Sequence, residues 1–125
     1  MQQGFDPRKF LDLAKDLTID GDYERDARAR TAMGRLYYSV FLLAWQKLRE
    51  KGIPIENDDK IHQSVIETYN DNRLSNIGNG LHQLRDKRRD ADYHMMTSVT
   101  LADCKKCIEL SDYIIDLIDQ VREIK

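Results

Sequence analysis

The chain has 125 residues, of which 41% are hydrophobic and 34% are charged, and this composition excludes a disordered or fibrous protein. Its length fits one domain over residues 1–125, large enough to bury a core. The formal net charge of −2 gives no overall attraction to nucleic acid, so a polyanion site would have to be a local patch of cations.

Apolar residues at helical spacing predict two helices in the first half of the chain. The first covers residues 7–18 and begins after Asp6, a good N-cap. Residues 20–22 form a turn, and a long helix then covers residues 22–51 and ends at Gly52. The middle of this second helix is apolar on almost every face, which predicts that other helices surround it.

The second half of the chain predicts three more helices. One fits residues 58–71, and the next runs from about residue 74 to residue 94. Gly78 and Gly80 weaken the start of the latter helix, since each costs about 1 kcal/mol relative to alanine, so we expect it to kink or to begin late.

The last predicted helix follows a break at residues 97–100. Thr100 and Asp103 resemble an N-terminal capping pair, and helical periodicity continues through residues 104–121. No stretch alternates like a strand. The fold class is therefore predicted to be all-α, a five-helix antiparallel bundle of the up-down kind.

Neither a membrane segment nor a secretion signal is expected. The most apolar run, residues 36–45, is about half of the roughly 20 residues that span a bilayer. Residues 1–10 lack the apolar run of a signal peptide, and two cysteines suit a reducing compartment. We therefore expect a cytoplasmic protein.

Cys104 and Cys107 form a C-x-x-C pattern, but no second pair or histidine spacing suggests a metal site. Buried structural cysteines are the favoured interpretation, and we predict neither a metal nor a cofactor. His62 and His82 each stand alone in a helix and are interpreted as structural or solvated. Arg35, at the edge of the long apolar helix, must find an acceptor.

The densest cation cluster lies in residues 84–94, "LRDKRRDADYH". One interpretation is a solvated helix face with weak ion pairs. The other is a phosphodiester site, because histidine exchanges protons near neutral pH and arginine presents a fork of donors that matches phosphate. One histidine and one arginine are few for cleavage, unless two copies of the chain meet across a dimer axis.

This stretch resembles the signature of the HEPN family, an arginine and a polar residue followed a few positions later by a histidine. The match is "RDADYH", residues 89–94, with four residues between Arg89 and His94, and Arg88 offers a second register with five. Residues 30–48 and 100–118 are similar to the second and closing helices of one branch of small prokaryotic HEPN proteins. The resemblance thus covers most of the chain in order.

The resemblance implies a homodimeric, metal-independent endoribonuclease that cleaves RNA by attack of a ribose 2′-OH on the adjacent phosphate. His94 would transfer protons. Arg89, alone or together with Arg88, would bind the scissile phosphate. Asp90 would orient one of these groups by hydrogen bonding. Two further cations would hold flanking phosphates, Arg85 and Lys87.

Many HEPN proteins are toxins paired with a nucleotidyltransferase antitoxin, or parts of antiviral defence systems. Toxins silenced by adenylylation carry a tyrosine two residues after the histidine, whereas this chain has Met96 there and Tyr93 on the other side of His94. Other members have lost cleavage. The alternative function is therefore a non-catalytic helical module that binds a nucleotide or a partner protein through Arg88, Arg89 and His94.

Overall fold

The structure is a computed structural model that describes residues 4–19 and 21–124. Asp20, in the predicted turn, lies outside the described residues. The described residues form five helices and no strand, which confirms the predicted all-α bundle. The helices are α1 (Arg8–Ile19), α2 (Arg25–Glu50), α3 (Ile61–Asp71), α4 (Ser75–Tyr93) and α5 (Leu101–Asp119).

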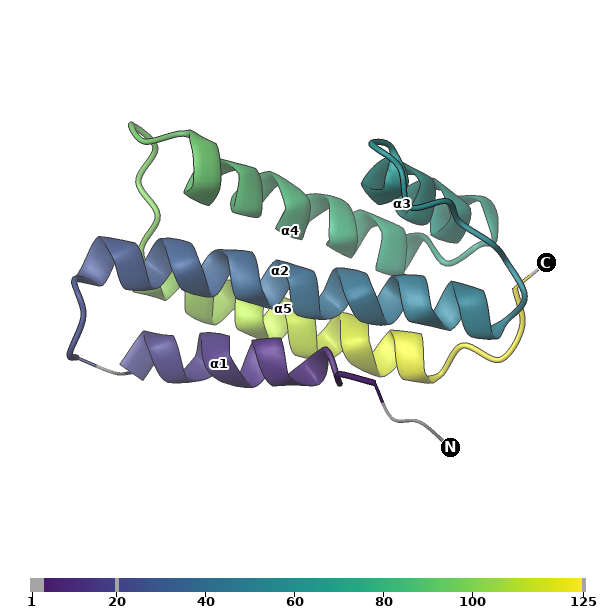
Figure 1. The fold of residues 1–125 in the computed structure, drawn as a ribbon, viewed down its shortest axis with the longest axis horizontal. Helices are drawn as coiled ribbons and strands as arrows, with labels where there is room; N and C mark the ends of the chain where they lie inside the picture. Colours follow the sequence, from purple (N-terminus) through teal and green to yellow (C-terminus); the bar gives the residue numbers. More distant parts are fainter. Residues whose placement is uncertain (1–3, 20, 125) are drawn as a thin grey trace.

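Four of the helices run antiparallel in chain order, and α3 lies at a steep angle across one end of them (Figure 1). The central helix is α2, which packs against all the others, as its apolar sequence predicted. The predicted antiparallel succession therefore describes α1, α2, α4 and α5 but not α3. With 11 residues, α3 buries its apolar face mainly against α4, and the Tyr69 hydroxyl donates to the Ala44 carbonyl of α2 over 2.7 Å.

The helix starts follow from side-chain caps. Asp6 accepts from the Arg8 amide over 3.0 Å, as predicted for an N-cap. The start of α2 lies later than predicted, because the Glu24 carboxylate accepts from the amides of Asp26 and Ala27. At α5, Thr100 and its capping partner three residues on exchange two hydrogen bonds of 3.0 and 3.1 Å, which confirms the predicted capping pair.

The glycines in the first turns of α4 do not delay the helix, which begins at Ser75, so the expected late start is wrong. Both glycines are buried where neighbours approach closely. A methyl group on Gly80 would clash with the buried Ile114 of α5, and one on Gly78 would meet Asn70 and lie 3.0 Å from the Ile66 carbonyl oxygen of α3. Packing against α3 and α5 therefore offsets the low helix propensity of glycine.

Candidate functional site

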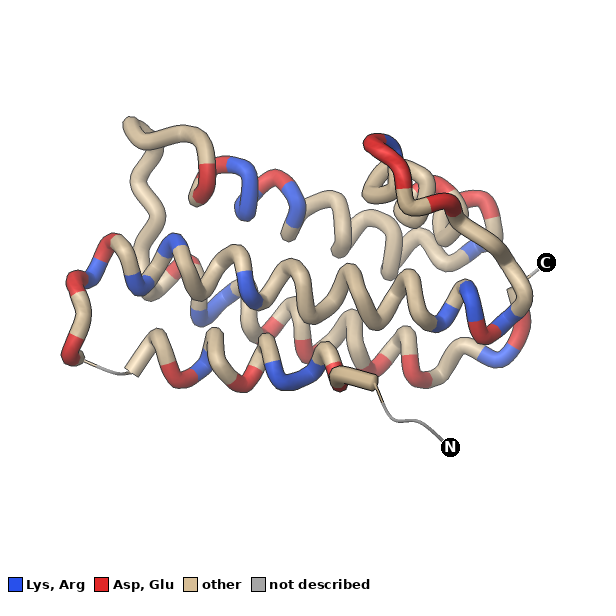
Figure 2. The backbone as a smooth tube through the Cα atoms, in the orientation of Figure 1, with Lys and Arg blue, Asp and Glu red and all other residues tan. Residues whose placement is uncertain are grey.

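All six predicted site residues lie on the second half of α4 or at its end, and the structure distributes them around that helix. Figure 2 shows the Lys and Arg residues of α4 gathered toward its C-terminal end, opposite arginines in the N-terminal half of α2. Local positive charge therefore occurs at this end of the bundle although the net charge of the chain is −2.

His94 forms the C-cap of α4, and its backbone amide donates to the Asp90 carbonyl. The His94 Nδ1 atom lies 2.7 Å from Asp90 Oδ1, with 59% of the His94 side chain exposed and 34% of the Asp90 side chain. When the neutral ring carries its proton on Nδ1 and donates it in a hydrogen bond to the carboxylate, Nε2 is unprotonated and can act as a base. Asp90 is thus placed to hold the imidazole in one orientation, and its role in a reaction stays a prediction.

Arg88 lies on the flank of α4 that faces α2. Its Nε donates to Asp92 Oδ2 over 2.9 Å, and its Nη2 donates to the Tyr38 hydroxyl over 3.1 Å. Only 14% of the Arg88 side chain is exposed. The guanidinium also lies 5.1 Å from the Tyr38 ring centroid and 5.9 Å from that of Tyr93, within cation–π range.

The other three cations are less constrained. Arg89 and Lys87 are exposed, and the Arg89 side chain makes no hydrogen bond or ion pair with any residue that the structure describes. Arg85 is half-buried, and its Nε is enclosed without a hydrogen-bond partner among those residues. The exposed Arg89 guanidinium is therefore open to a ligand, whereas Arg85 Nε can be reached only if the side chain moves.

The structure does not join Arg89 and His94 within one protomer. The two residues are five positions apart, which is about 140° around an α-helix at 100° per residue. Arg88 and Arg85 face α2 and α3, whereas His94 pairs with Asp90 on another flank. The structure thus brings together His94 with Asp90, and Arg88 with Asp92 and Tyr38.

Arg30 of α2 is a residue that the sequence analysis missed. Its guanidinium donates to the carbonyl oxygens of Ala91 at 2.9 Å and Thr97 at 2.7 Å, with further bonds to three carbonyls nearby. Arg30 therefore caps the end of α4 and fixes the segment that carries His94. No local pattern signals this role, since the contacts reach more than 60 positions along the chain.

Rings from α2 and α3 adjoin the arginines of α4. His62 Nδ1 lies 2.6 Å from the Tyr37 hydroxyl, and the imidazole stacks on Phe41 with centroids 4.2 Å apart. Burial, followed by the positive charges of Arg85 and Arg88, lowers the pKa of His62 to about 4. His62 is thus a partnered, neutral histidine, in line with its predicted structural role, and it also lies beside two predicted site residues.

Three other sequence expectations have clear outcomes. Arg35 has its guanidinium 5.1 Å from the Phe10 ring centroid and 5.3 Å from that of Tyr38, so aromatic faces take the place of the expected acceptor. His82 is exposed, with Nε2 3.5 Å from Asp86 Oδ2. Both cysteines are buried, as expected, and the Cys104 thiol donates to the Ala29 carbonyl.

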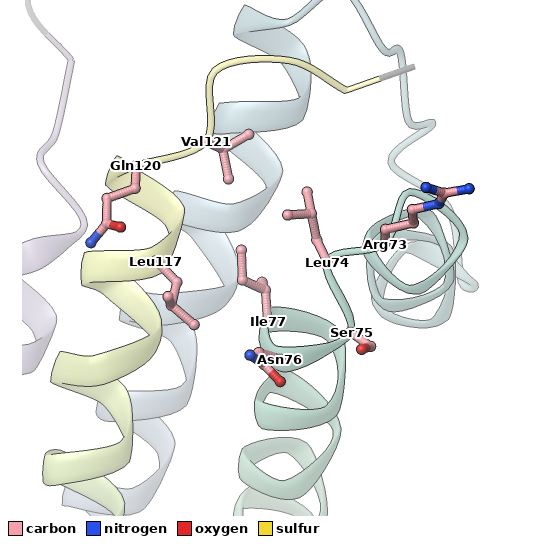
Figure 3. Close-up of a pocket in the computed structure, with 8 residues that line it drawn as sticks. All are labelled: Arg73, Leu74, Ser75, Asn76, Ile77, Leu117, Gln120 and Val121. Atoms are coloured by element: carbon pink, nitrogen blue, oxygen red, sulfur yellow. The ribbon is translucent and has the colours of Figure 1, made fainter.

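A cavity of about 250 Å³ lies at the opposite end of α4 from His94, between the start of that helix and the end of α5 (Figure 3). Arg73 points away from Leu117 of α5, and the inner wall is apolar (Figure 3). The residues that line the cavity are Arg73, Leu74, Ser75, Asn76, Ile77, Leu117, Gln120 and Val121. None of these is a predicted site residue.

The described residues contain neither a cluster of metal-ligating side chains nor a membrane-spanning helix. Residues 4–19 and 21–124 contain no group of three or more His, Cys, Asp or Glu side chains placed to hold a metal ion. Over the same residues, every helix is too short or too polar to cross a bilayer.

Comparison with known proteins assigns no family. A search against protein-family models gave no match. A protein of Methanocaldococcus jannaschii named "Uncharacterized protein MJ0628" is 26% identical over an alignment of 134 positions, which covers 94% of this chain and 81% of that protein. No solved structure matched. The name of the archaeal protein states no activity, so the function has to be argued from the residues.

Proposed function

We propose that this chain is a HEPN-type, metal-independent endoribonuclease that acts as a homodimer. The observation that carries the proposal is the exposed His94, whose Nδ1 lies 2.7 Å from Asp90 Oδ1. It stands at the end of a helix whose last three turns carry the cations Arg85, Lys87, Arg88 and Arg89. A paired, solvent-facing imidazole at the same end of a helix as several guanidinium groups suits acid–base chemistry on a phosphodiester.

The reaction would use His94 for proton transfer and the arginines for charge. The imidazole Nε2 accepts the proton of the ribose 2′-OH as that oxygen attacks the adjacent phosphorus. The bond from phosphorus to the 5′ oxygen breaks, and the leaving oxygen takes a proton from an imidazolium. The products are a 2′,3′-cyclic phosphate and a 5′-hydroxyl. Arg89 would stabilise the charge that develops on the phosphoryl oxygens, and Arg88 would hold a neighbouring phosphate.

A dimer accounts for the separation of Arg89 and His94 around α4. A base and an acid are both needed, and each protomer offers one His94. Two copies related by a two-fold axis would place two histidines and two sets of arginines around one scissile phosphate. Arg89, which is exposed and has no partner within the described residues, is then free to reach across the axis.

The alternative is a non-catalytic module that binds a nucleotide or a partner protein with the same cations. It is favoured by the engagement of Arg88 with Asp92 and Tyr38, which occupies one motif arginine. A toxin or antiviral defence role, with a nucleotidyltransferase antitoxin or another defence partner, belongs to the ribonuclease proposal. Genomic neighbours of the coding sequence would identify such a partner.

The test is cleavage of a mixed pool of single-stranded and structured RNA in EDTA by wild type, His94→Ala and His82→Ala. His82 is a matched control, because it is an exposed histidine on the same helix with an aspartate partner four residues on. We expect wild type and His82→Ala to leave cyclic phosphate ends, and His94→Ala to lose at least 100-fold in rate. Equal rates for His94→Ala and wild type, or no cleavage at concentrations that populate a dimer, would contradict the proposal.

A further inference from the structure

Five side chains from three helices meet beside the cation-rich end of α4, and we call them the ring–arginine cluster: Tyr37, Tyr38, His62, Arg85 and Arg88. Positive charge in this cluster exceeds negative charge. Among the residues that the structure describes, Asp92 pairs with Arg88 and no carboxylate pairs with Arg85. The charges of both arginines act on His62 and Tyr37, so the two guanidinium groups lie near the same rings.

Several donors in the cluster lack acceptors among the residues that the structure describes. Arg85 Nε is enclosed without a partner. The Tyr38 hydroxyl accepts from Arg88 Nη2, which leaves its own proton free to donate. When the Tyr37 hydroxyl donates to His62 Nδ1, the neutral imidazole carries its proton on Nε2 as a further donor.

An enclosed guanidinium N–H without an acceptor is unfavourable, and a shift of the half-buried Arg85 side chain toward an oxyanion would remove that cost. Phosphate suits the arrangement, because its oxygens accept several hydrogen bonds at once and pair with the planar fork of arginine. Tyr93, exposed at the end of α4 and 5.9 Å from the Arg88 guanidinium, adds a ring on which a base can stack.

We propose that the ring–arginine cluster is a phosphate subsite for a single RNA strand, in which Arg85, Arg88 and Tyr38 bind one phosphate away from the scissile one. His62 completes the subsite from α3. Arg88 and Arg85 stand six and nine residues before His94, so the subsite lies about 9–14 Å along α4 from the end of the helix at 1.5 Å per residue. The inference rests on the proposed ribonuclease function and adds α2 and α3 to its substrate-binding surface.

The experiment measures binding of a 2′-O-methyl RNA oligonucleotide, which cannot be cleaved, as a function of salt. The proteins are wild type, Arg85→Gln, Tyr38→Phe and Arg49→Gln. Arg49→Gln is the control for loss of one charge, because Arg49 lies at the far end of α2 against Trp45. Cleavage of unmodified RNA is measured with the same preparations.

We expect Arg85→Gln to weaken binding about tenfold, as for one charge-assisted hydrogen bond. It should reduce the slope of log affinity against log salt by about 0.7, the value for one phosphate of a single strand. Tyr38→Phe should weaken binding by about threefold with an unchanged slope, because only a neutral donor is lost. Arg49→Gln should bind like wild type.

The outcomes separate the subsite from the ribonuclease proposal. Wild-type cleavage, with Arg85→Gln binding as tightly and as salt-dependently as wild type, would overturn the subsite and leave the ribonuclease in place. Oligonucleotide binding that depends on Arg85 and Tyr38, without cleavage by wild type, would support the subsite and overturn the ribonuclease. Equal weakening by Arg49→Gln and Arg85→Gln would overturn the subsite, because it would indicate only a diffuse charge effect.

Discussion

At the scale of single residues, two histidines of this chain have opposite surroundings. His94 is exposed and paired with a carboxylate, whereas His62 is half-buried among Tyr37, Tyr38 and Phe41, near two arginines. Burial, followed by the nearby cations, disfavours the imidazolium form of His62. The surroundings therefore make His94 the better candidate for proton transfer and leave His62 as a neutral donor or acceptor.

The neutral state of His62 predicts a loss of stability in mild acid. Its folded-state pKa of about 4 lies below the unfolded value of about 6.5, so the unfolded chain takes up this proton first. The free energy of unfolding should therefore fall between pH 6.5 and pH 4. His62→Asn should be less stable than wild type at pH 7, because the substitution removes the ring that stacks on Phe41. Its free energy of unfolding should, however, fall less steeply as the pH is lowered.

Thermal unfolding from pH 7.5 to pH 4 measures this difference, with His82→Asn as the control for loss of an exposed histidine. The lowered carboxyl pKa values of Glu24 and Asp103 are common to all three proteins. A decline of equal steepness in wild type and His62→Asn would show that His62 is not the titrating group.

At the scale of helices, the start of α4 depends on close packing more than on helix propensity. Gly80 lies against the buried Ile114 of α5, and Gly78 lies against α3. Since α4 carries His94 at its other end, this packing sets where the candidate site stands relative to α5. Small residues act here as spacers that let two helices approach.

Two glycine substitutions should therefore have opposite effects. Gly80→Ala should lower the free energy of unfolding by about 1–3 kcal/mol, because its methyl group overpacks Ile114. Gly34→Ala, in the middle of α2, should raise it by up to about 1 kcal/mol, because the new methyl group would lie 3.8 Å from Asp92 Oδ1, an ordinary contact. Urea unfolding measures both. Stabilisation by Gly80→Ala would contradict the close packing of α4 and α5.

At the scale of the whole molecule, Arg30 links the centre of the bundle to the candidate site. The guanidinium of this α2 residue holds carbonyl groups on both sides of His94, from Asp90 to Thr97. The end of α4 and the connection to α5 therefore have one common anchor. An ordered His94 backbone depends on a residue that is remote in sequence.

Loss of the Arg30 guanidinium should loosen this connection more than the bundle as a whole. Arg30→Gln should lower the free energy of unfolding by about 1–3 kcal/mol, because several carbonyl groups lose their donors. Amide hydrogen exchange in residues 94–99 should rise at least tenfold, with smaller changes in α1 and α5. Arg25→Gln, an exposed position on the same helix, is the matched control. Unchanged exchange at residues 94–99 would show that Arg30 does not anchor them.

The sequence alone determined the helical class, five helices to within a few residues at most ends, and the capping pair at Thr100. It also placed the candidate residues of α4 on one short segment and predicted that α2 is central. These features depend on interactions between residues that are close along the chain, namely apolar periodicity, side-chain caps and turns. Sequence patterns over a few residues therefore predict these features directly.

Only the tertiary structure decided the angle of α3, the early start of α4, the anchoring by Arg30 and the meeting of His62 with Arg85 and Arg88. Each of these depends on contacts between segments far apart in sequence. Packing shape selects glycine at a helix contact, and long polar side chains bind whichever carbonyl or ring the fold brings near. Neither a glycine at a helix contact nor a long-range polar contact produces a periodic sequence pattern. The ring–arginine cluster can therefore be identified only from the assembled arrangement of three helices.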